Sequence, residues 1–143
     1  MPDILHRVGI AAPPERVFNS LSSVDGLRSW WTANTSGDPG TGGTIDFGFC
    51  KMQVLDATPG ARVHWRCVDG PAEWVGTDVD FDLKWRDDQT FVLFKHANWK
   101  EPVEFMHHCS TKWATYLLSM KSMLETGKGR PHPDDLHISA RGD

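Results

Sequence analysis

The chain of 143 residues has few cysteines and no run of basic residues longer than two. The cysteines are odd in number and widely spaced without a CxxC pair, at Cys50, Cys67 and Cys109, which is typical of reduced thiols rather than of a disulfide framework. Lys and Arg total 15 against 19 Asp and Glu, a formal charge of −4, so a surface that follows phosphates is not expected. Nucleic acid is therefore excluded as an expected partner.

Long apolar runs are also missing from the sequence. No stretch approaches the ~20 residues that a membrane-spanning helix needs. The N-terminal MPDILHRVGI lacks the basic and then apolar segments of a signal peptide. We therefore expect no membrane association and a cytoplasmic location.

Aromatic bulk is what the chain does have, with seven Trp and seven Phe but only one Tyr. A chain of this size buries roughly 68–70% of its unfolded surface, which is enough for a core without disulfides or a structural metal. The composition shows no break or linker. We predict one folded domain over residues 1–143.

The first 31 residues predict one strand and two short helices. Apolar residues alternate over 4–10, and Pro13 and Pro14 prevent the strand from continuing. Pro14 suits the first turn of a helix, and apolar residues then recur at helical spacing over 14–21. A second short helix is expected over 23–31.

The middle of the chain predicts five further strands. They follow a segment rich in Gly, Pro and Asp over 35–43 and are separated by short turns, which favours an antiparallel meander. In the predicted strand over 77–83, every other residue is Asp, which indicates a sheet with one packed and one solvated face. The predicted strands cover 45–49, 52–58, 63–67, 77–83 and 90–97.

The period changes to 3.6 over 104–126, which predicts one long helix that ends at Gly127. At ~1.5 Å per residue, this helix is about 35 Å long and can cross a small sheet. Residues from about 128 to 143 have no apolar period and are expected to form an extended or flexible tail. The result is an α+β fold, a curved antiparallel sheet of about six strands wrapped around the long C-terminal helix.

Five motifs support this architecture through a resemblance. They are APPERVFNSLSSVDGLRSWWT (12–32), GGTIDF (42–47), EWVGTDVDFDL (73–83), FVLFKHANW (91–99) and WATYLLSMKSMLETGKGRPHP (113–133). Together the motifs resemble the SRPBCC (START-like, helix-grip) superfamily, and within it the group similar to activators of the heat-shock protein 90 ATPase. The resemblance implies a hydrophobic ligand cavity between the sheet and the long helix, with no fixed catalytic residue, no cofactor and no usual metal.

The predicted site combines inward-facing positions of the sheet with tryptophans at its rim. Two consecutive aromatics at a helix end cannot both face one core, so one of Trp30 and Trp31 is expected over the open end of the grip. Trp74 and Trp99 would complete this rim. The predicted ligand-binding residues are Trp30, Trp31, Phe49, Trp65, Cys67, Trp74, Thr77, Phe81, Phe94, His96, Trp99, Trp113 and Leu117.

The leading hypothesis is a binding protein for a small hydrophobic or aromatic molecule, with His6, His96 and Thr77 at its polar end. One alternative is an enzyme similar to cyclases or dehydratases, in which His6 or His96 moves a proton. Another is a module that binds a chaperone, as the heat-shock protein 90 activators do. A homodimer is compatible with each hypothesis. The adjacent His107 and His108 point about 100° apart on a helix, so a metal site is not expected there.

Overall fold

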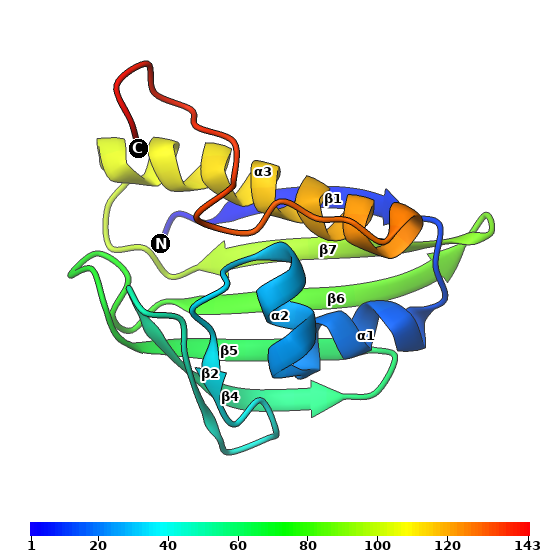
Figure 1. The fold of residues 1–143 in the computed structure, drawn as a ribbon. Helices are drawn as coiled ribbons and strands as arrows, with labels where there is room; N and C mark the ends of the chain where they lie inside the picture. The colour runs from blue at the N-terminus through cyan, green and yellow to red at the C-terminus, as the bar shows by residue number, and fades with distance from the viewer.

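The computed structural model describes residues 1–143 and contains one strand, two short helices, six strands and one long helix in chain order (Figure 1). The elements are β1 (Ile4–Ile10), α1 (Pro14–Ser22), α2 (Val24–Trp30), β2 (Ser36–Gly37), β3 (Thr44–Asp46), β4 (Lys51–Thr58), β5 (Arg62–Asp69), β6 (Asp78–Arg86), β7 (Gln89–Ala97) and α3 (Glu104–Thr126).

All seven strands form one antiparallel sheet in the order β1-β7-β6-β5-β4-β3-β2. Strands β2 to β7 follow one another as neighbours, and the last strand, β7, also pairs with the first strand, β1. The helix-grip fold predicted from the sequence is thus confirmed. The strand beyond the expected six is the two-residue β2, which lies inside the predicted turn segment.

Helix α3 covers the concave face of the sheet. Figure 1 shows it running along β1, while α1 and α2 lie in front of β5 and β6. Cys109, Trp113, Leu117, Met120 and Leu124 are buried along one side of α3, in agreement with the 3.6-residue period predicted over 104–126. No helix in the chain is both long enough and apolar enough to cross a membrane.

The alternation expected in β6 is present. Val79, Phe81 and Leu83 are buried on the face against which α1 packs, while the intervening carboxylates face outward. There Asp80 accepts two hydrogen bonds from Arg62, at 2.8 and 3.0 Å. The packed face therefore carries the core, and the outer face is covered by ion pairs between neighbouring strands.

The strand predicted over 45–49 is shorter than expected. The carboxylate of Asp46 accepts a hydrogen bond from the Gly48 N–H at 2.8 Å, and Gly48 has a φ of 89°, which turns the chain out of the sheet. Alternation no longer applies beyond this turn. The prediction that Phe49 faces inward is therefore wrong, because this residue is 48% exposed.

Candidate functional site

A pocket of about 320 Å³ opens between the first half of α3, the end of α2 and the C-terminal tail of residues 128–143. Its wall is mainly aromatic, with charged and imidazole side chains on the side of the tail. The lining residues are Trp31, Thr32, Phe49, Pro71, Trp74, Phe105, His108, Cys109, Lys112, Trp113, Tyr116, His132, Asp135, His137 and Asp143.

Helix α3 supplies one face of the pocket. Its lining residues include Phe105, Cys109, Lys112 and Tyr116, at steps of four, three and four residues. Side chains three or four positions apart share one face of a helix, so these four project in the same direction. Cys109 is buried, while Phe105, Lys112 and Tyr116 are half-buried, so this face combines aromatic and polar side chains at the edge of the core.

Three tryptophans from different elements form the apolar wall. The ring centroids of Trp31 and Trp113 lie 4.8 Å apart, and Trp74 stacks on Trp113 at 6.0 Å with an interplanar angle of 13°. The indole N–H of Trp74 donates to Cys109 Sγ at 3.4 Å. All three rings are almost fully buried, so packing fixes the wall.

His96 supports this wall from behind. Its Nδ1 accepts the indole N–H of Trp113 at 3.1 Å, and its Nε2 lies 2.8 Å from Thr77 Oγ1. The Thr77 hydroxyl donates to the Trp74 carbonyl oxygen at 2.6 Å, so it accepts from Nε2. An indole is a donor only, and Nδ1 must therefore carry no proton. Burial lowers the pKa of His96 to about 3, in agreement with a neutral ring.

Neither histidine considered for proton transfer lines the pocket. His96 uses both ring nitrogens within the core, and His6 Nε2 bonds the Ser110 carbonyl oxygen at 3.0 Å. The histidines at the pocket are instead His108, His132 and His137. No three His, Cys, Asp or Glu side chains in the structure are grouped to hold a metal ion.

Four of the residues predicted for the site line the pocket, namely Trp31, Phe49, Trp74 and Trp113. The other nine are at most 2% exposed and do not line it: Trp30, Trp65, Cys67, Thr77, Phe81, Phe94, His96, Trp99 and Leu117.

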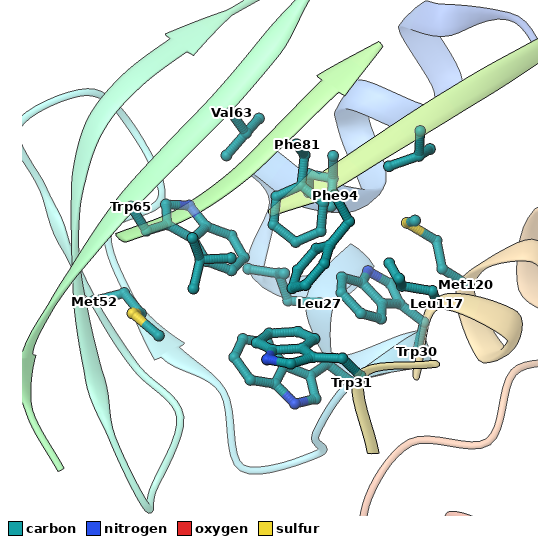
Figure 2. Close-up of a cluster of buried hydrophobic side chains, with 14 of the residues drawn as sticks. Leu27, Trp30, Trp31, Met52, Val63, Trp65, Phe81, Phe94, Leu117 and Met120 are labelled. Atoms are coloured by element: carbon teal, nitrogen blue, oxygen red, sulfur yellow. The ribbon is translucent and has the colours of Figure 1, made fainter. Parts of the chain in front are cut away.

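Side chains fill the centre of the space between sheet and helix. Phe81 lies between Trp65 and Phe94, with centroid distances of 5.1 and 5.3 Å, and Figure 2 shows these rings converging with Leu27 and Leu117. Alternation along the strands predicts that Trp65, Phe81 and Phe94 face inward. In the structure they do, and their rings pack against one another. Of the expected rim, Trp31 and Trp74 line the pocket, whereas Trp30 and Trp99 are buried and do not.

The polar side of the pocket centres on Lys112, which is not among the site residues predicted from the sequence. Its ammonium bonds the carboxylate of Asp135, a buried tail residue that also accepts the Tyr116 hydroxyl at 2.8 Å. Burial opposes ionisation of Asp135, but the hydrogen bonds from Lys112 and Tyr116 lower its pKa overall. Helical spacing from Cys109 and Trp113 could have indicated Lys112 and Tyr116. No local pattern indicated Asp135.

The tail of residues 128–143 has no helix or named strand and lies along α3 (Figure 1). The Arg130 N–H donates to Ser119 Oγ at 2.7 Å, and Ser119 Oγ donates to the Trp30 carbonyl oxygen at 2.8 Å. Further along, the backbone of His132 bonds Trp31 and Ala33, at 2.7 and 3.0 Å. These bonds hold the tail at the side of the pocket.

Comparison with protein families matches residues 11–125 to the family described as Activator of Hsp90 ATPase homolog 1-like protein. Among solved structures, the Aha1 dimer from Colwellia psychrerythraea is 44% identical, with a TM-score of 0.84 over 90% of this chain and 100% of its own. CalU16 from Micromonospora echinospora is 19% identical, with a TM-score of 0.74 over 85% of this chain and 73% of its own, and is similar in fold alone. A search of curated proteins finds no match.

Proposed function

The chain belongs to the family of activator of Hsp90 ATPase homolog 1-like proteins, and from this premise we propose that it binds a small apolar or aromatic molecule. The observation that carries the proposal is the pocket of about 320 Å³ walled by Trp31, Trp74 and Trp113. Sites for small molecules are usually pockets of roughly 300–1,000 Å³ with mostly apolar walls and a few polar groups. The pocket beside α3 has this size and this composition.

Desolvation of a flat ligand would supply most of the binding free energy. Apolar surface removed from water contributes roughly 25 cal/mol per Å². Because the three tryptophans are already packed and hydrogen-bonded, little side-chain freedom is lost when a ring enters. The affinity for an uncharged aromatic probe should therefore depend little on salt.

Isothermal titration with indole tests the proposal through two exposed apolar residues. Phe49 lines the pocket and is 48% exposed, whereas Leu118 is 55% exposed on α3 and does not line it. We expect Phe49→Ala to weaken binding by roughly three- to tenfold, since it removes part of the wall, and Leu118→Ala to leave it unchanged. Absence of heat from the native protein, or equal effects of the two substitutions, would contradict the proposal.

The positions of His6 and His96 favour binding over the cyclase- or dehydratase-like alternative. A general base must lie within hydrogen-bond reach of the ligand proton. His96 is instead fully engaged with Trp113 and Thr77, and His6 lies outside the pocket. We therefore propose no turnover by either residue.

Two proposals rest on the relative from Colwellia psychrerythraea. That protein is described as an Aha1 dimer and is 44% identical to this chain, which supports a homodimer and keeps a chaperone partner as the alternative function. Light scattering coupled to size exclusion tests the homodimer, since a mass of 16.1 kDa would contradict it.

We also propose a cytoplasmic location, which the three buried, unpaired cysteines support.

A further inference from the structure

The ammonium group of Lys112 lies at the polar end of the pocket. Its side chain is only 13% exposed. Nζ bonds the carboxylate of Asp135, the carbonyl oxygen of Leu136 at 2.9 Å and Asp143 Oδ2 at 2.7 Å. An ammonium has three N–H donors, and a buried one is costly unless they are used. Two carboxylates and one carbonyl oxygen therefore complete the surroundings of Lys112.

Both oxygens of the Asp143 carboxylate face hydrogen-bond donors. While Oδ2 faces Lys112, Oδ1 accepts the backbone N–H groups of Ile138 and Ser139 at 2.8 and 2.9 Å. His137 Nδ1 lies 3.8 Å from Oδ2. The hydrogen bond from Lys112 lowers the pKa of Asp143 to about 2, so the ionised form is the one held. The pocket thus contains a built position for one carboxylate.

The two carboxylates on Lys112 differ in how firmly they are attached. Asp135 is buried and also bonds Tyr116 and His132, at 2.8 and 3.3 Å. The Asp143 side chain is 14% exposed, against 6% for Asp135, and it is bonded to α3 only through Lys112. A carboxylate from outside could replace that of Asp143 without disturbing Asp135 and without changing the charge around Lys112.

We propose that the ligand is an aromatic carboxylate, whose carboxylate replaces that of Asp143 on Lys112 and whose ring lies against the wall of Trp31, Trp74 and Trp113. The proposal rests on the proposed binding function and names the chemistry of the ligand. Lys112 and Trp113 both line the pocket, so one small molecule can contact both. In this arrangement Asp143 is an internal competitor for the site.

Three probes of similar shape and different charge test the proposal by isothermal titration. Indole-3-acetate is an anion, indole-3-ethanol is neutral and tryptamine is a cation at pH 7.5. We expect indole-3-acetate to bind about tenfold more tightly than the other two, because it alone gains a charge-assisted hydrogen bond. Equal affinities for indole-3-acetate and indole-3-ethanol would overturn the carboxylate proposal alone. If none of the three binds, the proposed binding function fails as well.

Substitutions locate the effect. Lys112→Met should abolish the preference for indole-3-acetate while binding of indole-3-ethanol persists. Asp143→Asn keeps Lys112 and weakens the competitor, so it should strengthen binding of indole-3-acetate several-fold and leave indole-3-ethanol unchanged. Asp134→Asn, an exposed tail residue without a side-chain contact to Lys112, is the matched control. Unchanged affinity for indole-3-acetate in Asp143→Asn would overturn the proposal, and this variant remains informative if Lys112→Met does not fold.

Discussion

At the scale of single residues, hydrogen-bond chemistry decides the role of His96. The alternation of inward and outward side chains along β7 correctly placed this residue on the inner face of the sheet. Alternation does not show what a buried ring will contact there. The structure gives Trp113 and Thr77 as partners, and because the indole can only donate, the imidazole must stay neutral. His96 is thus a positioning residue for the pocket wall.

The neutral state of His96 predicts a pH dependence of stability. Its pKa is about 3 in the folded protein and near 6.5 when the chain is unfolded, so between these values the unfolded chain binds more protons. The contribution of His96 to the free energy of unfolding should therefore be highest above pH 6.5. It should decrease as pH falls toward 3, by up to about 1.4 kcal/mol per pH unit.

Urea unfolding of the native protein and of His96→Gln between pH 4.5 and 7.5 measures this effect. The amide can accept from Trp113 and donate to Thr77 but does not titrate, so the slope with pH should be flatter in the variant. His107→Gln changes an exposed histidine and should keep the native slope. Parallel slopes in His96→Gln and the native protein would show that His96 does not resist protonation.

At the scale of elements, the C-terminal tail forms part of the pocket, which its composition did not indicate. It contains no apolar period, and it was expected to be extended or flexible. In the structure it supplies His132, Asp135, His137 and Asp143 to the pocket. Its attachment to α2 and α3 passes through Ser119, which bonds both Trp30 and Arg130. The tail is therefore one side of the site.

Gly129 is the position at which this attachment is most sensitive. A Cβ there would collide with the Ser29 carbonyl oxygen and lie 3.1 Å from Ser119 Oγ, the acceptor of the Arg130 N–H. Gly129→Ala should raise the rate of tryptic cleavage in the tail by about tenfold, since a steric cost of 1–3 kcal/mol favours the detached tail.

The cleavage experiment has a matched control in Gly40→Ala. The Cβ at that position would meet only the Asp38 carboxylate, at 3.2 Å in an exposed loop, so the added methyl group can be accommodated. Mass spectrometry of the early fragments identifies cleavage after Lys128, since the Arg130–Pro131 bond is not a tryptic site. Equal rates for the two alanine variants would show that Gly129 does not hold the tail in place.

At the scale of the whole molecule, helix α3, the segments between the other elements and the tail meet around one pocket, so a bound ligand should stabilise the entire fold. A ligand that binds only the folded state at 100 times its Kd contributes about 2.7 kcal/mol. For a chain of this length we expect Tm to rise by roughly 5–10 °C. Calorimetry with saturating indole-3-acetate checks this, and Phe49→Ala should show a smaller rise at the same concentration. An unchanged Tm in the native protein would contradict binding to the folded state.

The sequence by itself determined the elements and which face of each is buried. Alternation in β6, the 3.6-residue period of α3 and Gly127 after it each report a local property, and the structure agrees with them. These patterns, with the family motifs, were sufficient for the helix-grip fold. Where a glycine with positive φ interrupted the alternation, at Gly48, the prediction for Phe49 was wrong.

Only the tertiary structure decided where the pocket lies. The periodicity of a strand shows that Trp65, Phe81 and Phe94 face inward, but not whether the space between them is open or filled, and here their rings fill it. The hollow lies instead where α2, α3 and the tail meet. Its polar end joins Lys112 to Asp143, 31 positions away, and a contact between such distant residues depends on the path of the chain rather than on any local pattern.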